Sequence, residues 1–281
     1  MIKRISIIGL ILLVIGIIGT IFTVKSQLSG EEMLEEKAVD TNDFANIDIK
    51  TDNAEIIVLP VEDEKARVEL LGNISRYNFS TEVEGDTLNV QVKTKLKKLI
   101  HFDIFSKSLS LTVLVPKKEY ERIRVQSNNG LIEVTDLEGS EMQLATNNGS
   151  VHVKNVKGDT LMLDTDNGRI DMKNVDTKLA NVSSNNGRIE LENVQGEIIG
   201  NTDNGRISLL TEDLDRPIEL STMNGKIDVN SKNKPTNAML DLKTHNGKIQ
   251  VFGSSEWDNM IGNGENLIKI STDNGSITIT N

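Results

Sequence analysis

Several residue types are scarce in this sequence, and each scarcity narrows the possible folds. The 281 residues include no cysteine, so disulfides cannot stabilise an exported domain, and its stability must come from a packed core. The lack of cysteine also excludes attachment of a lipid through a cysteine side chain. Aromatic residues make up only 3% of the chain, which suits a narrow interior built from Ile, Val, Leu and Met.

Basic residues are outnumbered as well. The chain has 31 Lys and Arg residues against 42 Asp and Glu residues, a formal net charge of −11, which argues against nucleic acid as a partner. The three histidines share no ligand spacing. Asp166, Asp203 and Asp273 precede Asn-Gly as in some calcium loops, but the remaining ligands are missing. We expect no metal and no cofactor.

Long apolar segments are limited to one run near the amino terminus. Ile5 to Val24 are 20 consecutive uncharged, mostly aliphatic residues, which is enough for one transmembrane helix. Lys3 and Arg4 precede the run and Lys25 follows it. The simplest topology is a single-pass protein of the cell membrane whose carboxyl-terminal domain is extracellular. A cleaved signal peptide is the alternative.

The dominant feature is a repeat in the carboxyl-terminal half. The motif Ser/Thr-x-Asn-Gly occurs eight times, and each copy precedes a short alternation in which the second and fourth residues are apolar. The glycines are separated by 19, 19, 19, 18, 20, 22 and 28 residues. They are Gly130, Gly149, Gly168, Gly187, Gly205, Gly225, Gly247 and Gly275. Such units are too small to bury their own apolar side chains and must stack on one another.

This repeat predicts an all-β fold, a β-solenoid with about 19 residues per coil and two strands per coil. Asn-Gly permits positive φ at both residues, so each motif fits a corner of a coil. A type I′ turn in an antiparallel meander is the alternative. In a solenoid with coils about 4.8 Å apart along one axis, one asparagine per coil would join a ladder of stacked amides. The predicted ladder is Asn129, Asn148, Asn167, Asn186, Asn204, Asn224, Asn246 and Asn274.

The patterns divide the chain into four segments. They are an amino-terminal membrane anchor (1–28), an acidic stalk (29–43), an irregular β cap with the first coils (44–126) and the Asn-Gly repeat β-solenoid (127–281). Thr51 to Val58 look like a decayed copy of the repeat, with Ala54 in place of glycine. The last strand, Ser276 to Thr280, is expected either to offer a free edge or to be covered by the insertion Phe252 to Asn266.

The order of these elements resembles a known family. The apolar segment is followed by Leu-Asn-Val-Gln-Val (Leu88 to Val92), by Leu-Thr-Val-Leu-Val-Pro (Leu111 to Pro116) and by the serial Asn-Gly-x-Ile units. This order is similar to that of the candidate-adhesin family of unknown function (DUF 4097), which includes LiaG-like proteins of Gram-positive bacteria. The resemblance covers nearly the whole chain. It implies a membrane-anchored β-solenoid associated with cell-envelope stress, and it supplies no catalytic residues.

Five consecutive repeats place a cation directly after Asn-Gly. The five are Arg169, Arg188, Arg206, Lys226 and Lys248. Alternation turns these side chains outward, at neighbouring coils of one face. One hypothesis is that the column binds an anionic wall polymer such as a teichoic acid. The alternative is a surface ladder of salt bridges, because acidic residues such as Asp171 and Glu190 lie two positions later.

A second basic cluster carries aromatic residues and precedes the repeats. Its candidate membrane-contact residues are Lys93, Lys95, Lys97, Lys98, Phe102 and Phe105. Basic and aromatic side chains together favour contact with anionic lipid near the anchor. A long hairpin loop packed on the cap is the alternative.

Enzymatic activity is not expected. Outward acidic residues recur with the repeat and mark no particular coil, whereas glycan-processing sites need carboxylates clustered at one place. The chain has no Gly-x-Ser-x-Gly motif, no P-loop and no dinucleotide fingerprint. We expect a binding or scaffold protein of the cell envelope, whose partner is a membrane signalling protein or a cell-wall polymer. A cell-surface adhesin that binds glycan is the alternative.

Overall fold

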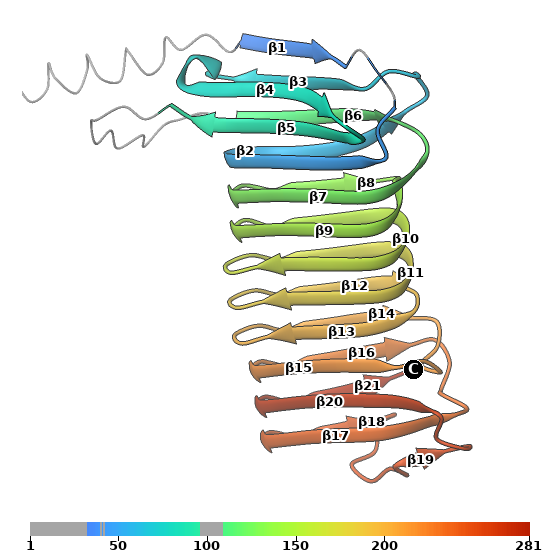
Figure 1. Cartoon of the computed structure of the whole chain (residues 1–281). Coiled ribbons are helices and arrows are strands. Elements are labelled where there is room, and N and C mark those ends of the chain that lie inside the picture. Colours follow the sequence, from blue (N-terminus) through green and yellow to red (C-terminus); the bar gives the residue numbers. More distant parts are fainter. Residues whose placement is uncertain (1–32, 40, 42, 96–108) are drawn as a thin grey trace, which may run out of the picture.

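The computed structural model describes residues 33–39, 41, 43–95 and 109–281 (Figure 1). The predicted anchor at 1–28, including the apolar run, lies outside the described residues. Within the ranges just given, no helix combines the length and the apolar character that crossing a bilayer requires.

The described chain is a rod of stacked β coils (Figure 1). Each coil contributes one strand to each of two sheets, and successive coils pair in parallel, as in Leu161 with Ala180 and Val151 with Ile170. An antiparallel meander would pair these strands in opposite directions. The all-β solenoid is therefore confirmed, and the meander is excluded.

Sheet 1 contains twelve strands or strand halves. Along the axis they are β4 (Tyr77–Glu84), β5 (Thr87–Thr94), the first half of β2 (Asn46–Val61), β7 (Glu119–Asn129), β9 (Glu138–Asn148), the second halves of β10 (Val151–Thr165) and β11 (Ile170–Ser184), β13 (Glu197–Thr202), β15 (Ile218–Asn224), β20 (Asn266–Asn274), β17 (Ala238–Asn246) and β19 (Met260–Ile261).

Sheet 2 faces sheet 1 across the core. Along the axis it contains β1 (Met33–Ala38), β3 (Arg67–Gly72), β6 (Leu109–Pro116), the second half of β2, β8 (Ile132–Thr135), the first halves of β10 and β11, β12 (Ile189–Val194), β14 (Ile207–Thr211), β16 (Ile227–Ser231), β21 (Ile277–Thr280) and β18 (Ile249–Val251). A short 3-10 helix, η1 (Ile74–Arg76), connects β3 to β4.

The order of the coils departs from the sequence at both ends of the rod. The coil made by β2, which comes first along the chain, lies between the coils β5/β6 and β7/β8. The last coil, β20/β21, lies between β15/β16 and β17/β18. Coils that follow one another in the sequence are therefore not always neighbours at the ends of the rod. At the far end, the segment between Val251 and Asn266 is long enough to bring the chain back past one coil.

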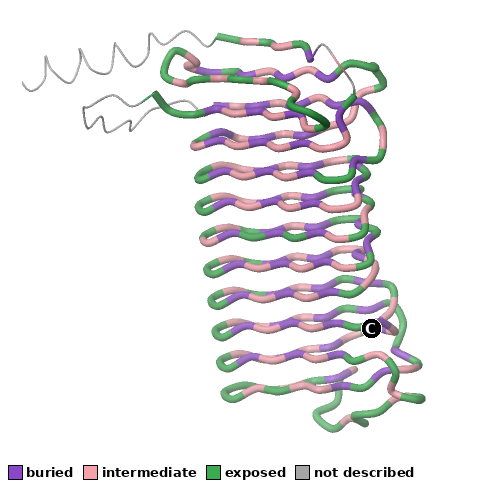
Figure 2. The backbone as a smooth tube through the Cα atoms, viewed as in Figure 1, coloured by how far each residue is buried: buried purple, intermediate pink, exposed green. Residues whose placement is uncertain are grey.

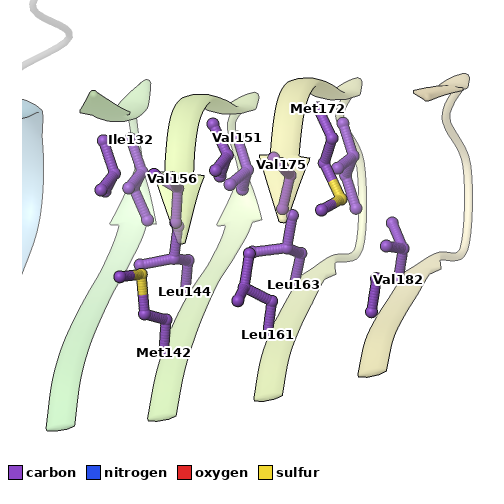
Figure 3. Close-up of a cluster of buried hydrophobic side chains, with 14 of the residues drawn as sticks. Ile132, Met142, Leu144, Val151, Val156, Leu161, Leu163, Met172, Val175 and Val182 are labelled. Atoms are coloured by element: carbon purple, nitrogen blue, oxygen red, sulfur yellow. The ribbon is translucent and has the colours of Figure 1, made fainter. Parts of the chain in front are cut away.

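Apolar side chains fill the space between the two sheets. Along most strands buried residues alternate with intermediate or exposed ones (Figure 2), and the apolar pairs after Asn-Gly, such as Ile170 and Met172, point inward. Figure 3 shows these side chains stacked from coil to coil, with Leu144 and Leu163 in neighbouring coils. Each buried aliphatic residue stabilises the rod by about 1.5–3 kcal/mol. Ile249 is only partly buried, because β18 belongs to the terminal coil.

Two predictions about the ends of the chain are wrong. Part of the expected stalk forms β1, which pairs antiparallel with β3 and extends sheet 2. The last strand, β21, has no free edge, because it pairs with β16 on one side and β18 on the other. At the cap end an antiparallel strand covers the edge of β3. At the far end the interleaved coil gives β21 a neighbour on each side.

Candidate functional site

The Asn-Gly corners form a continuous edge along the rod, and close packing explains their glycines. A Cβ added at Gly168 or Gly187 would lie 1.7 Å from the carbonyl oxygen of the glycine one coil before. Among the eight motif glycines only Gly130 has a positive φ, and none of the ladder asparagines does. The predicted reason for Asn-Gly was therefore wrong. Glycine is required because neighbouring corners touch, and not because the backbone is left-handed.

The Ser/Thr of most motifs has a structural role. In six of the eight motifs its hydroxyl donates a hydrogen bond to the glycine carbonyl of the adjacent coil, as in Thr165 to Gly149 (2.9 Å) and Thr222 to Gly205 (3.1 Å). All of these six residues except Thr244 are almost fully buried. Because these hydroxyls already donate hydrogen bonds within the fold, they are not available to a ligand.

The asparagine amides hydrogen-bond from coil to coil along the exposed edge. Each Nδ2 donates to the Oδ1 of the preceding coil, at 3.0 Å for Asn186 to Asn167 and 2.9 Å for Asn274 to Asn224. In spatial order the ladder is Asn53, Asn129, Asn148, Asn167, Asn186, Asn204, Asn224, Asn274 and Asn246. Asn274 precedes Asn246, as the interleaved last coil requires.

A second, shorter ladder lies on the opposite edge of the rod. Asn193, Asn174, Asn155 and Asp136 each have a φ between 51° and 58° and hydrogen-bond in series. Asn and Asp tolerate this left-handed conformation better than other residues with a side chain. Sequence reasoning missed this ladder, although the Asn or Asp six residues after glycine recurs in four successive repeats.

The cation column lies on the outer face of sheet 2, and most of its charge is paired. Arg169 contacts Asp171 and Glu190, and Arg188 also contacts Glu190. The hydrogen bond to Asp171 and the nearby carboxylates raise the pKa of Arg169 above its usual value. Exposed pairs of this kind contribute at most about 1 kcal/mol each.

The carboxyl-terminal part of this column is interrupted. Arg206 and Lys226 share Asp228, but the next coil presents Ser276, and Lys248 follows one coil later. The five cations therefore do not occupy neighbouring coils. Lys248 is exposed, and no carboxylate of the described residues lies within ion-pair distance of it. The geometry resembles the salt-bridge ladder more than an open anion-binding track.

Most of the predicted membrane-contact cluster lies outside the described residues, namely Lys97, Lys98, Phe102 and Phe105. Lys93 and Lys95 are described and exposed at the end of β5. Lys95 donates from its backbone to the Arg76 carbonyl (2.8 Å) and from its Nζ to the Ser75 carbonyl (3.1 Å). These two contacts fix the end of β5 against η1.

Sheet 1 presents a different surface toward the far end of the rod, beginning with a polar groove. The groove encloses about 270 Å³ and crosses four coils, β11, β13, β15 and β20. Its outward lining residues are Ser183, Asn185, Asn201, Asp203, Ser221, Met223, Ser271 and Asp273. Hydroxyls and amides dominate this lining, which contains no Lys or Arg. Such a surface can exchange hydrogen bonds with polyols, and its carboxylates repel anions.

An apolar stripe lies at the tip of sheet 1, toward the other end of these strands. On β20 the ion pair of Lys269 with Glu219 separates the stripe from the groove. Leu267, Met239 and Met260 are opposite one another on the neighbouring strands β20, β17 and β19. Their exposed fractions are 45%, 40% and 58%, so three large apolar side chains in register face solvent. The pairing of Ile218 with Ile268 places the exposed Pro217 beside Leu267. We call Pro217, Leu267, Met239 and Met260 the tip stripe.

The connections under the tip stripe are held by two charged residues. Asp215 accepts hydrogen bonds from the Thr236 hydroxyl (2.7 Å) and from the amides of Thr236 and Asn237 (both 2.8 Å). Burial disfavours its charge, but these hydrogen bonds outweigh burial and lower the pKa of Asp215. Arg216 donates to the Val194 carbonyl (2.8 Å), and burial lowers the pKa of Arg216. The stripe therefore lies on a fixed support.

Residues suited to metal binding do not converge in the described part of the chain. No group of three or more His, Asp or Glu side chains lies close enough together there to hold an ion. His152 contacts Asp171 at 3.0 Å on the outer face of sheet 2.

Comparisons with known proteins identify the relatives of this fold. The model of the family described as Toastrack DUF4097 matches residues 44–280. The resemblance expected from the sequence is therefore confirmed. No curated protein matches the chain.

Solved bacterial structures share the architecture. A candidate lipid binding protein from Parabacteroides distasonis is 20% identical with a TM-score of 0.52, and the match covers 88% of this chain and 97% of that one. A candidate adhesin from the same organism is 14% identical with a TM-score of 0.51, over 89% and 98% of the two chains. A candidate adhesin from Parabacteroides merdae is also 14% identical with a TM-score of 0.51, over 90% and 98%. These similarities establish the fold.

Proposed function

The chain belongs to the Toastrack DUF4097 family, and from this premise we propose that it is a membrane-anchored, envelope-exposed scaffold protein. In this proposal the apolar run Ile5 to Val24 anchors the chain, the rod lies outside the membrane, and the tip stripe binds another protein of the envelope. The setting is a cell-envelope stress response, and the partner is a membrane signalling protein.

The observation that carries the proposal is the tip stripe. Three large apolar side chains exposed side by side are unusual on a free surface and are typical of sites where proteins meet. Two of them are methionines, whose flexible side chains adapt to a partner surface. Sheet 2 offers no comparable surface at the same height, because its outward residues on β16 and β21 are polar or charged.

The polar groove favours a second function, an adhesin that binds glycan. Its hydroxyls and amides match the hydrogen-bonding groups of a neutral sugar chain, whereas its carboxylates oppose a polyanion. Candidate adhesins occur among the solved structures with this fold, and that description applies to those proteins. The groove and the tip stripe share no lining residue, so their functions can be separated by variants of single side chains.

In-cell photo-crosslinking tests the scaffold function. A photoreactive residue at Met239 or Leu267 should capture a membrane protein, whereas one at Thr278, in the same coil as Leu267 but on sheet 2, should not. Capture that is equal at all three positions, or absent at Met239 and Leu267, would contradict the proposal.

Binding to isolated cell-wall polysaccharide tests the adhesin function. Asn201→Ala and Ser221→Ala in the groove should weaken binding if the groove holds glycan, and Met239→Ala should leave it unchanged. Loss of binding with the groove variants, together with no protein captured at the stripe, would favour the adhesin.

A further inference from the structure

We propose that the corner of the rod formed by β1, β3 and η1 is seated on the lipid bilayer, so that the rod stands upright and holds the tip stripe away from the membrane. This inference rests on the proposed anchor. It adds a contact between the folded rod and the lipid surface, made by the exposed residues Met33, Leu34 and Leu71, which we call the cap corner.

The path of the chain brings this corner to the anchor. The described structure begins at Met33, which pairs with Gly72, and the chain leaves at Lys95 and returns at Leu109. Lys95 hydrogen-bonds to the Arg76 carbonyl in η1, and Ser110 pairs with Leu71. All three ends of described chain therefore meet at one corner of the rod (Figure 1).

The length of chain before Met33 limits the distance to the bilayer. The apolar run ends at Val24, and eight residues, 25–32, separate it from Met33. Fully extended, these residues span at most about 28 Å. The sheets hold twelve strands each, which makes the rod about 50 Å long along its axis, so only its cap end lies within easy reach of an anchor.

The surface of the cap corner suits a lipid interface. Leu34 and Leu71 pair directly across β1 and β3, and their exposed fractions are 59% and 44%. Met33 is 42% exposed beside them. The large exposed apolar side chains of the described chain number nine, and these three are the ones at the cap end. Apolar side chains at the end of an anchored rod lose contact with water when they enter the interface of the bilayer, and this burial is favourable.

Basic side chains lie at the same end of the rod, on sheet 1. Lys93 and Lys95 are exposed at the end of β5, on the same corner. Acidic side chains are also present, since Glu35 and Glu36 follow Leu34 on β1, and Lys37 contacts Glu35 at 3.6 Å. We therefore assign the seating mainly to the apolar residues, with the two lysines adding attraction to anionic lipid.

Depth-dependent fluorescence quenching tests the inference on the full-length protein in vesicles. The natural absence of cysteine allows single labels at Leu34→Cys in the cap corner, Ser183→Cys at mid-rod and Lys243→Cys on the terminal coil. The vesicles contain phosphatidylglycerol and phosphatidylcholine with a spin-labelled lipid as quencher. We expect a blue-shifted and severalfold more strongly quenched label at position 34, weak quenching at 183 and none at 243.

Matched substitutions separate seating from general changes in the surface. Leu34→Glu combined with Leu71→Glu should abolish the quenching of a label at Met33→Cys. Leu210→Glu in mid-rod, at a leucine about as exposed as Leu71 (43% against 44%), should not. Lys93→Gln with Lys95→Gln should reduce the quenching only in vesicles that contain phosphatidylglycerol.

Vesicle flotation distinguishes failure of this inference from failure of the anchor. A protein that does not float with the vesicles refutes the anchor and with it the proposed function. A protein that floats while its label at position 34 is quenched no more than the label at 243 refutes the seating alone. Equal quenching at all three positions means that the rod lies flat, and it also refutes the upright arrangement.

Discussion

Replacing Gly187 by alanine should destabilise the rod severely, because the corner has no room for a methyl group. The added Cβ would lie 1.7 Å from the Gly168 carbonyl oxygen and 2.6 Å from its carbonyl carbon. Real Cβ contacts are longer than 3.0 Å, so the two corners must separate by more than 1 Å, about a quarter of the coil spacing.

The separation breaks the hydrogen bonds between the two corners. They include Asn186 to Asn167 (3.0 Å) and the Ser184 hydroxyl to the Gly168 carbonyl (3.2 Å). The Asn186 backbone amide also loses its bond to the Asp166 carbonyl (2.8 Å). At about 0.5–1.5 kcal/mol for each of these bonds, the free energy of unfolding should fall by about 2–5 kcal/mol, a large part of the stability of an ordinary domain.

Gly85→Ala provides the control, because its Cβ would meet no atom within 4 Å while its φ is +62°. Placing alanine in that left-handed conformation costs about 1–2 kcal/mol. Urea unfolding of both purified variants, followed by circular dichroism in the β-sheet band, measures the loss in the free energy of unfolding for each. If Gly85→Ala destabilises the protein as much as Gly187→Ala does, the corner glycines are needed for backbone conformation, and the packing argument is wrong.

Three further predictions follow from the ladders and from the ends of the rod. Asn186→Ala removes two ladder hydrogen bonds and Asn246→Ala removes one. Asn186→Ala should therefore lower the free energy of unfolding by about 1–3 kcal/mol, about twice the loss caused by Asn246→Ala. Equal losses in urea unfolding would refute a continuous ladder. The pKa of Asp215 is lowered in the fold, so Asp215 stabilises the protein above its ordinary pKa of 3.8, and this stabilisation is lost as the pH falls through the lower folded value. Asp215→Asn should therefore flatten the acid side of the plot of unfolding free energy against pH. An unchanged plot would contradict this. Deleting residues 266–281 should also unfold β17 and β18, because in the described chain β18 pairs only with β21 and β17 pairs only with β19 and β20. Backbone amides of β17 that stay protected from hydrogen exchange in this variant would disprove the interleaved order.

The glycine spacing was sufficient to predict the solenoid, its inward aliphatic pairs and the asparagine ladder. A fixed period puts equivalent residues of successive units at the same place in each coil, so one repeat determines all of them. The order of the coils was not accessible in this way. Ile218 can pair with Ile268 or with Leu240 equally well, because both follow the same alternation, and the repeat pattern is identical for either neighbour. Only the 28-residue interval before Gly275 hinted at an irregular return.

The candidate binding surface was harder to predict than the fold. The cation column was visible because it recurs with the repeat, yet recurrence also supplies four of the five cations with a carboxylate, as Asp228 does for Arg206 and Lys226. The tip stripe has no such signal. Met260 belongs to an insertion without periodicity, and its place beside Met239 follows from an antiparallel pairing that no repeat specifies. Surfaces that depend on the irregular ends of a repeat protein require the structure.

The interleaving of the first and last coils has a consequence for how such rods change in size. Neither end can gain or lose a coil without disturbing two neighbours, whereas the middle units from Gly149 to Gly187 stack in simple succession. Deleting or duplicating a 19-residue unit there would shorten or lengthen the rod by about 4.8 Å and leave both closed ends intact. The length of the rod is therefore adjustable only from within.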